Sequence, residues 1–332
     1  MTEKAIAPMK VLVTGIAGFI GFHVAQALSA RGHTVTGVDS LTPYYGMGLK
    51  KARLSALDPA ITFHETSVAD RTAFGDLVGD QSPDVLVHLA AQPGVRHSIE
   101  HPFDYAEANL MGHLSVLEAC RHSQSITHLV YASSSSVYGE NSTAPFSEDE
   151  PAVDPVSLYA ATKRADELMS SSYAHLYGLK QVGLRFFTVY GPLGRPDMAY
   201  WMFTQRIFDH EPIRVFNQGQ MQRDMTYVDD VVAGVCATIE RVPTFAADER
   251  SHRIYNVGNS RPERLMDMIS TLETLIGHPA EKIMEPMQPG DVTETYADIS
   301  RFQADYGYAP KTRMEDGLAA FVDWYRDWRT RA

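Results

Sequence analysis

Short apolar runs alternate with amphipathic stretches along the first half of the chain. The runs have the length and composition of strands that are buried in a parallel sheet. They cover Lys10–Thr14, Thr34–Val38, Val85–Leu89 and Leu129–Ala132. Between them, Phe19–Arg31 carries apolar residues on one helical face, and Leu110, Leu114 and Leu117 mark a second amphipathic helix. This alternation predicts an α/β fold in which helices cover both faces of a parallel sheet.

The second half of the chain has a less regular pattern, in which we expect helices, two strands and then two or three further helices beyond Ser260. The predicted elements are helices from Pro155 to about Tyr177 and at Val228–Ile239, strands at Val182–Phe187 and Ile254–Val257, and a final aromatic helix at Phe321–Trp328. Because the helix at Val228 is expected to return to the first lobe, we predict two interleaved lobes. The first lobe comprises 9–187 and about 225–258, the smaller C-terminal lobe comprises about 188–224 and 259–330, and 1–8 form a flexible tail.

The composition narrows the class of protein. The chain has 332 residues, of which 44% are hydrophobic and 21% are charged, as is typical of a folded soluble domain. No apolar run approaches the ~18–20 residues that cross a bilayer, and Met1–Met9 lacks the apolar core of a secretory signal. We therefore expect a cytoplasmic protein. The net charge of −12 argues against a nucleic-acid partner, which would require a basic face.

The residues that usually bind metals form no obvious ligand pattern. The two cysteines, Cys120 and Cys236, both fall in apolar segments that are predicted to be helical, so we expect buried free thiols. The 13 histidines are scattered along the chain. We therefore predict no metal site.

A glycine-rich turn, TGIAGFIG from Thr14 to Gly21, joins the first predicted strand to the first predicted helix. Gly15 allows a tight turn, Gly18 lets the main chain approach a pyrophosphate, and Gly21 lets the helix pack near the strand. The amino end of the helix then offers N–H groups and a partial positive charge to phosphates. The pattern predicts the dinucleotide-binding turn of a Rossmann-type doubly wound parallel sheet; an ordinary strand–turn–helix is the alternative.

A carboxylate ends the second predicted strand. Asp39 is placed to accept hydrogen bonds from the adenosine ribose hydroxyls, and it would repel a ribose 2′-phosphate. The next residue is Ser40 rather than arginine, so we expect NAD and not NADP. Lys50, Lys51 and Arg53 lie farther along the chain and leave NADP as the alternative.

Tyr159 and Lys163 stand four residues apart in the predicted long helix, so their side chains share one face. A free tyrosine has a pKa of about 10, and a neighbouring ammonium group and a positively charged nicotinamide both favour its phenolate. The pair can then take a proton from a sugar hydroxyl while NAD takes hydride from the same carbon. A solvated helix face is the alternative interpretation of this spacing.

A run of serines follows the predicted strand at Leu129–Ala132, within Tyr131–Gly139 (YASSSSVYG). The carboxyl edge of an α/β sheet is where ligands bind, and a hydroxyl there could bond to the reacting oxygen and relay its proton. A serine-rich turn is the alternative. The order of glycine turn, acidic residue, serine run and Tyr-x-x-x-Lys favours the chemical interpretation.

With these motifs in place, the chain resembles the extended short-chain dehydrogenase/reductases that act on nucleotide sugars, over Lys10 to about Trp328. More narrowly, it is similar to the UDP-glucuronate 4-epimerases. The segments that carry this resemblance are His88–Ser98 (HLAAQPGVRHS), Tyr131–Gly139, Pro155–Lys163 (PVSLYAATK), Leu184–Met198 (LRFFTVYGPLGRPDM), Val215–Asp230 (VFNQGQMQRDMTYVDD) and Met287–Asp298 (MQPGDVTETYAD).

The resemblance implies that Ser134, Tyr159 and Lys163 form a catalytic triad and that Lys163 also holds the nicotinamide ribose. It implies cofactor contacts at Gly15, Ala17, Gly18, Phe19, Ile20, Gly21, Asp39, Ser40, Ser67, Val68, Leu89, Ala90, Ala91, Gln92, Asn109, Ser133, Tyr159, Lys163 and Phe186. Relatives often carry Gly-Asp where this chain has Thr66-Ser67, and that aspartate helps hold the adenine. Ser67 is expected to replace it only in part.

The same resemblance implies NAD-dependent 4-epimerisation of UDP-glucuronate to UDP-galacturonate through a 4-keto intermediate. Related dehydratases carry two acids directly after the catalytic serine, and related decarboxylases carry a glutamate at the second of these positions. This chain has Ser135 and Ser136 there, which argues against both reactions. A 4-epimerase of a neutral UDP-hexose or UDP-N-acetylhexosamine stays open, as does a non-enzymatic NAD-sensing regulator, which would not need the triad.

A uronic acid substrate requires that its carboxylate be held still, because a 4-keto uronic acid is a β-keto acid that loses CO₂ readily. Arg195 can bind a carboxylate through two hydrogen bonds, unless it is an ordinary surface arginine. The resemblance adds Ser135, Ser136 and Thr188 around that carboxylate. It implies further substrate contacts, mostly to the UDP moiety, at Arg96, Val215, Phe216, Arg223, Gln288 and Asp291.

A homodimer is also expected, because relatives pair two helices of each subunit in a bundle. The helix marked by Leu110, Leu114 and Leu117 and the helix from Leu158 to Tyr177 are the candidates. Packing within the core explains the apolar faces of these helices equally well.

Overall fold

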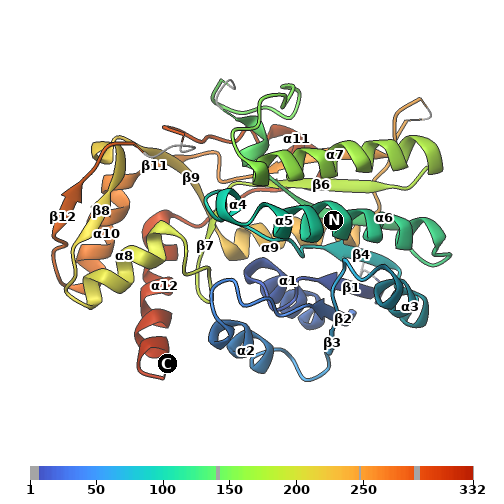
Figure 1. Ribbon diagram of the computed structural model, residues 1–332, viewed down its shortest axis with the longest axis horizontal. Coiled ribbons are helices and arrows are strands. Elements are labelled where there is room, and N and C mark those ends of the chain that lie inside the picture. Colours follow the sequence, from blue (N-terminus) through green and yellow to red (C-terminus); the bar gives the residue numbers. More distant parts are fainter. Residues whose placement is uncertain (1–6, 140–142, 247, 288–291, 332) are drawn as a thin grey trace, which may run out of the picture.

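The computed structural model describes residues 7–139, 143–246, 248–287 and 292–331. A sheet of seven parallel strands forms its centre, in the order β10-β6-β5-β4-β1-β2-β3 (Figure 1). The strands are β1 (Lys10–Thr14), β2 (Thr34–Asp39), β3 (Thr62–Glu65), β4 (Val85–His88), β5 (His128–Ser134), β6 (Gln181–Phe186) and β10 (His252–Val257). Strand β1 pairs with both β2 and β4, so the strand order reverses beside β1. Such a switch point is where doubly wound sheets bind their ligands.

Helices cover both faces of this sheet. One face carries α1 (Phe19–Ala30), α9 (Val228–Glu240) and α11 (Ser300–Tyr306), and the other carries α3 (Arg71–Gln81), α6 (Gly112–His122) and α7 (Leu158–Tyr177). Because successive side chains of a strand point to opposite faces, Val11 and Val13 pack against the helices on one face of the sheet, and Leu12 packs against the helices on the other face. The predicted α/β Rossmann-type fold with a doubly wound parallel sheet is therefore confirmed.

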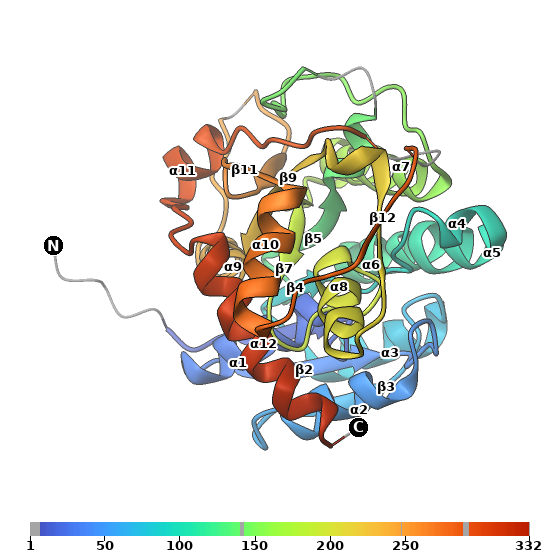
Figure 2. The ribbon, with the colours of Figure 1, turned by 90° about the vertical axis from the view of Figure 1, so that its left-hand side faces the viewer.

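A second group of elements has its own apolar core, called the second core below. It contains the helices α8 (Ala199–Phe208), α10 (Leu265–Ile276) and α12 (Met314–Arg329) and the strands β7 (Thr188–Tyr190), β8 (Ile213–Val215), β9 (Gln222–Tyr227), β11 (Pro262–Arg264) and β12 (Lys282–Met284). Tyr200, Trp201, Ile269, Leu318 and Phe321 lie at the centre of this core. Figure 1 shows α8, α10, β8 and β12 together at one end of the sheet, and in Figure 2 the helices α8, α10 and α12 lie in front of it.

Short elements complete the described chain. They are α2 (Met47–Ser55), α4 (His97–Glu100), α5 (Pro102–Tyr105), the π-helical turn η1 (Ala106–Met111) and the 3-10 turns η2 (Ser135–Tyr138) and η3 (Phe216–Gly219). In the described part of the chain, no helix is long and apolar enough to span a membrane. Cys120 and Cys236 are buried free thiols, as the sequence predicted.

The structure extends and corrects some predicted elements. The long helix α7 begins at Leu158 and not at Pro155, because the Ser157 hydroxyl accepts a hydrogen bond from the Ala160 amide (3.1 Å) and caps the helix there. Strand β5 runs on to Ser134, and α12 begins at Met314 rather than at Phe321. The apolar pattern did not predict β3, α2, α3 and α8, which have few regularly spaced apolar residues or lie in the segment whose pattern is irregular.

Candidate active site

A cavity of about 940 Å³ opens at the carboxyl edge of the central sheet and extends to the second core. Its walls come from the glycine turn after β1, the ends of β2, β4 and β5, helix α7 and the segment from Thr188 to Met225. A volume of this size is at the upper end of the range for small-molecule sites. The cavity therefore brings the predicted catalytic residues and most of the predicted cofactor and substrate residues to one place.

The glycine turn fits against its neighbours with no room for side chains. Gly15 has a φ of 75°, and a Cβ atom added to it would lie 2.7 Å from the Ala90 amide nitrogen. A Cβ on Gly21 would lie 2.1 Å from the Gly15 carbonyl oxygen. Gly18 precedes α1 without a side-chain cap, so amide groups at the amino end of this helix are available to a phosphate. This is the cradle that the pyrophosphate of a dinucleotide requires.

The Asp39 carboxylate lies at the end of β2 beside the glycine turn. It accepts hydrogen bonds from the amides of Ala17 (3.1 Å) and Leu41 (2.8 Å) and from the Lys50 ammonium (3.2 Å). Arg53 is fully buried and donates to the carbonyl oxygens of Ala17, Leu193 and Gly194. Lys50 and Arg53 are thus committed to internal contacts, which weakens the argument that they serve a ribose 2′-phosphate.

Most of the predicted cofactor residues line the cavity. They are Gly15, Gly18, Phe19, Ile20, Gly21, Asp39, Ser40, Ser67, Val68, Leu89, Ala90, Ala91, Gln92, Ser133, Tyr159, Lys163 and Phe186. Ala17 and Asn109 are not among the lining residues. The Asn109 side chain lies behind the wall, where it accepts from the Gln92 amide (2.8 Å) and donates to the Thr162 hydroxyl (3.0 Å). It thereby ties the loop after β4 to α7.

Ser134, Tyr159 and Lys163 line one wall of the same cavity. Ser134 ends β5, and its hydroxyl oxygen accepts from the Ser136 amide (3.2 Å) and hydroxyl (2.9 Å). The buried Lys163 ammonium donates to the Ala132 carbonyl oxygen (3.0 Å) and to the carboxylate of Asp166 (3.2 Å). Helix α7 thus presents Tyr159 and Lys163 to the serine end of β5, as the predicted chemistry requires.

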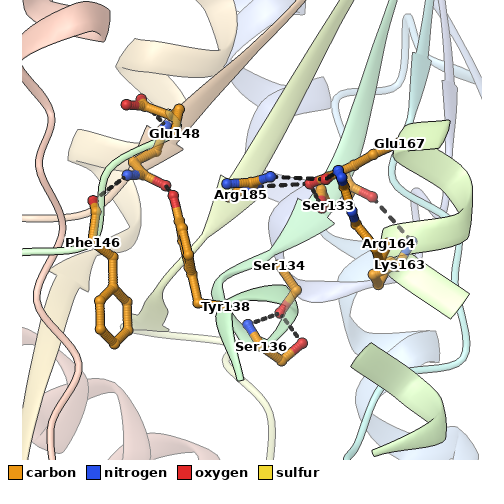
Figure 3. Close-up of polar contacts among 12 residues, drawn as sticks. Ser133, Ser134, Ser136, Tyr138, Phe146, Glu148, Lys163, Arg164, Glu167 and Arg185 are labelled. Carbon is orange, nitrogen blue, oxygen red and sulfur yellow. Dashed lines mark hydrogen bonds and ion pairs between the residues drawn. The ribbon is translucent and has the colours of Figure 1, made fainter. Parts of the chain in front are cut away.

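A buried ionic network supports this wall from behind (Figure 3). The Glu167 carboxylate accepts from the Ser133 hydroxyl (2.6 Å), from Arg185 (2.8 and 2.9 Å) and from Arg164 (2.8 Å). Burial opposes the ionisation of Glu167, but the bonds from Arg185 outweigh it and lower the Glu167 pKa. Ser133 therefore lines the cavity while its hydroxyl is bonded to Glu167. The network joins α7 to the ends of β5 and β6.

The predicted substrate residues divide into three groups. Arg96, Ser135, Ser136, Thr188, Arg195, Phe216 and Arg223 line the cavity. Val215 does not line it and is fully buried in the second core. Gln288 and Asp291 lie outside the described residues.

Arg195, the predicted carboxylate clamp, is engaged by a neighbouring acid. Its Nε donates to Asp197 Oδ1 (3.0 Å) and its Nη2 donates to Oδ2 (2.5 Å), and the Tyr44 hydroxyl donates to the same carboxylate (3.1 Å). Burial opposes the ionisation of Asp197, but Arg195 outweighs it and lowers the Asp197 pKa. Burial and Asp197 raise the pKa of Tyr44 to about 12, so its hydroxyl remains a donor. Asp197 and Tyr44 both line the cavity.

Several lining residues were absent from the sequence analysis. They include Tyr44, Tyr45, His97, Asp197, Arg206, Arg214, Glu263 and Arg264. The guanidinium groups of Arg96 and Arg214 each lie 5.5 Å from the centre of the Phe216 ring. The signal that could have found Asp197 is its place in the same GPLGRPDM segment as Arg195. The arginines are far apart in the sequence, and only the fold brings them together.

The histidines are less scattered than the sequence suggested. His97, His101 and Asp104 hold their ligand atoms within 4.8 Å of one another. The His97 and His101 rings stack at 4.2 Å, and His101 and Asp104 are exposed. The sequence did not predict this group of ligand-type residues, and the expectation of no metal site stays a prediction.

Comparison with known proteins gives consistent matches over most of the chain. The sequence profile of the NAD dependent epimerase/dehydratase family matches residues 11–258. A probable UDP-glucuronate 4-epimerase of Rhizobium meliloti is 43% identical over 331 residues, which cover 96% of this chain and 97% of that protein.

Solved structures match as closely in shape. The crystal structure of UDP-glucuronic acid 4-epimerase from Bacillus cereus, in complex with UDP-glucuronic acid and NAD, has a TM-score of 0.88 and 35% identity, and the match covers 96% of this chain and 100% of that one. UDP-glucose 4-epimerase of Thermotoga maritima, solved with UDP-glucose, has a TM-score of 0.87 and 30% identity over 97% of this chain and 100% of that one.

Proposed function

The chain belongs to the NAD dependent epimerase/dehydratase family, and we propose that it interconverts UDP-glucuronate and UDP-galacturonate by epimerisation at C4. The observation that carries this proposal is that one cavity contains the glycine turn, Ser134, Tyr159, Lys163 and Arg195. The first four features serve hydride and proton transfer, and the fifth is a cation for the sugar carboxylate.

The chemistry divides between the cofactor and the chain. Bound NAD would supply reversible hydride transfer at C4 of the sugar. The glycine turn and the amino end of α1 would hold the pyrophosphate of the cofactor, and the Asp39 carboxylate would accept hydrogen bonds from its ribose hydroxyls. Tyr159 takes the proton of the C4 hydroxyl, Ser134 hydrogen-bonds to the same oxygen, and the positive charge of Lys163 favours the phenolate of Tyr159.

The neutral groups near Ser134 favour epimerisation over the competing reactions. No carboxylate stands at Ser135 or Ser136 to remove a proton from the sugar. Arg195 holds the uronate carboxylate through its guanidinium, with hydroxyl donors from Ser135, Ser136 and Thr188. When the carboxylate is fixed, the bond that joins it to the ring is not aligned with the π system of the C4 carbonyl. The 4-keto sugar therefore keeps its carboxylate while it rotates in the site.

For the UDP moiety, we propose that the cationic groups at the second core bind the diphosphate. Arg96 and Arg223 supply charge, and Phe216 supplies an apolar surface beside Arg96. Arg214 also lies beside the Phe216 ring, but its guanidinium is paired with the Glu285 carboxylate (2.5 and 2.7 Å). The assignments of Val215, Gln288 and Asp291 to this moiety stay predictions. The proposed NAD-binding lobe (9–187 and about 225–258) and UDP-sugar-binding lobe (about 188–224 and 259–330) are supported by the separate apolar cores, except at α11, whose Phe302 and Tyr306 pack in the core of the central sheet.

A neutral UDP-hexose is the second candidate substrate, and a specific observation favours it. Asp197 already balances the charge of Arg195, so the cavity does not present an uncompensated cation at that point. A panel of UDP-glucuronate, UDP-glucose and UDP-N-acetylglucosamine separates the candidates. The uronate proposal requires the highest kcat/KM with UDP-glucuronate; equal or better use of UDP-glucose would reject it.

We also propose that the protein is a homodimer of cytoplasmic location. Apolar side chains are exposed along α7 at Leu168 (55%) and Leu176 (62%), and beside it at Phe103 (85%) and Met111 (55%). Leu117 is fully buried in the core, which agrees with the core-packing alternative at that position, while Met111 faces outward. Sedimentation of Leu168→Asp against wild type tests the dimer: the variant should become monomeric, and an unchanged mass would contradict this interface.

A further inference from the structure

A second carboxylate lies next to the catalytic lysine. Asp166 Oδ2 accepts a hydrogen bond from the Lys163 ammonium at 3.2 Å, one helical turn beyond the Tyr159–Lys163 pair. The side chains of Lys163 and Asp166 are 2% and 0% exposed. Among the described residues, the other oxygen of Asp166 has no hydrogen-bond partner. An ionised carboxylate in such surroundings depends on the one cation that faces it.

Other cations near this pair are committed elsewhere. Arg185, from β6, forms two hydrogen bonds with Glu167 at 2.8 and 2.9 Å. Arg164, on α7, bonds to the same Glu167 carboxylate (2.8 Å). Within the described chain, Lys163 is therefore the cation that holds Asp166.

The titratable rings around the pair are uncharged at neutral pH. Burial lowers the pKa of His88, on β4, to about 3 and that of His252, on β10, to about 4. Burial also holds the pKa of His113, on α6, well below its usual value and that of Tyr131, on β5, well above it. The strands β4, β5, β6 and β10 and the helix α6 thus present neutral groups or ones already paired to Lys163 and Asp166.

We propose that Asp166 is a positioning residue that fixes the Lys163 ammonium and sets how strongly its positive charge acts on the Tyr159 hydroxyl. An ammonium stabilises a nearby phenolate, whereas an ammonium bonded to a carboxylate presents a dipole whose field falls off faster. The charge state of Asp166 therefore determines how strongly Lys163 stabilises the Tyr159 phenolate. This inference rests on the proposed role of Tyr159 as the base.

The titration of Asp166 makes this control depend on pH. Burial opposes its ionisation more than Lys163 and the hydrogen bond favour it, and the Asp166 pKa rises to about 7. Below that pH the carboxyl group is neutral and the charge of Lys163 acts in full. Above it, the carboxylate opposes that charge. We therefore expect the ionisation of one of these two groups to make the ionisation of the other less favourable, because both depend on the charge of Lys163.

The Asp166→Asn variant tests the proposal, because asparagine has nearly the same shape but no charge. In NAD-loaded protein, tyrosinate absorbance is titrated with pH, and the same titration of Tyr159→Phe identifies the Tyr159 signal. We expect the midpoint to fall by about one pH unit in Asp166→Asn, since the Lys163 charge is unopposed. The acid limb of the kcat/KM profile should move to lower pH by the same amount.

Controls separate this role from a structural one. Asp323→Asn removes an exposed carboxylate on α12 and should leave the midpoint unchanged. Asp166→Glu keeps the charge and should bring the profile back toward wild type. An unchanged midpoint in folded Asp166→Asn, or a lower kcat with an unshifted profile, would overturn the proposal. The tyrosinate titration needs no sugar, so it still decides this point if UDP-glucuronate proves not to be the substrate.

A second measurement applies if Asp166→Asn does not fold. The buried carboxyl group of Asp224 also has a raised pKa, of about 6, so the test follows the carboxyl band that disappears at the higher pH. Infrared spectra of wild-type protein should show such a band, which disappears as the pH rises through about 7. Tyr159→Phe should retain this band. The absence of such a band in both proteins would overturn the proposal.

Discussion

The Arg195 guanidinium is held by both oxygens of the Asp197 carboxylate, through Nε (3.0 Å) and Nη2 (2.5 Å). This contact fixes the plane of the guanidinium and directs its remaining nitrogen, Nη1, toward other partners. An arginine held in this way can bind a substrate carboxylate with a defined orientation, because little of its side-chain freedom remains to be lost. Tyr44 adds a third donor to the same acid and anchors it (3.1 Å).

Arg195→Ala should lower kcat/KM for UDP-glucuronate by roughly 10- to 100-fold, which corresponds to the loss of one or two hydrogen bonds to a charged group. Its effect on UDP-glucose should be small, and some CO₂ should be released from UDP-glucuronate because the carboxylate is no longer fixed. Steady-state kinetics with both sugars and a CO₂ assay provide the measurement. If the variant used the two sugars as wild type does, Arg195 would not be the clamp.

Asp197→Asn is the companion variant, because it keeps Arg195 but removes the acid that orients it. We expect UDP-glucuronate to bind at least as tightly, since the guanidinium charge is no longer balanced, while kcat falls because the orientation is lost. Steady-state kinetics with UDP-glucuronate measure KM and kcat separately, and the expected result is a lower kcat without a higher KM. Parallel losses in binding and turnover would indicate instead that Asp197 only supports the local fold.

Tyr159→Phe should lower turnover by about 10²- to 10⁴-fold, the usual contribution of a positioned general base. The side chain keeps its ring contacts, including the edge-to-face contact with Tyr105 at 6.1 Å, so NAD should stay bound. Turnover is measured by product formation, and bound nicotinamide by its release on denaturation. A variant with full activity would reject Tyr159 as the base.

Much of the fold could be predicted from the sequence because its signals are local. The buried strands β1, β2, β4, β5 and β6 are short apolar runs, and Gly15 and Gly21 mark the turn with positions that admit no side chain. The elements α2 and β3 were missed, because their apolar residues are few and they are stabilised by packing against the rest of the chain.

The composition of the site was harder to predict than its motifs. Tyr159 and Lys163 are linked by helical spacing, but Asp197 and Tyr44 stand 153 residues apart in the sequence and meet only in the fold. Asn109 does not line the cavity, and it supports the site through hydrogen bonds to Gln92 and Thr162. No sequence pattern indicates these two contacts. The motifs therefore located the chemistry, whereas the second layer of contacts depends on tertiary packing.

The stability of the protein should depend on pH through two buried carboxyl groups. Burial raises the pKa of Asp166 to about 7 and that of Asp224 to about 6, above their usual value of 3.8. A carboxyl group with a raised pKa favours the folded state at low pH, and this contribution is lost as the pH rises through the folded-state value. Other groups aside, thermal stability should therefore fall between about pH 4 and pH 7 and level off above that.

Thermal melting of wild type and Asp166→Asn across this range separates the two contributions. The fall should be shallower in the variant, which cannot carry the buried charge above pH 7. The two curves should converge below about pH 4, where Asp166 is protonated in both the folded and the unfolded protein. Parallel curves over the whole range would show that Asp166 is already ionised at low pH.

The central claim, C4 epimerisation of a uronic acid with retention of its carboxylate, is tested most directly by following purified protein and UDP-glucuronate with NMR and no added reductant. We predict that UDP-galacturonate signals appear and approach a constant ratio with UDP-glucuronate, while no free CO₂ or UDP-pentose accumulates. Formation of UDP-xylose or another decarboxylated sugar as the only product would contradict the account.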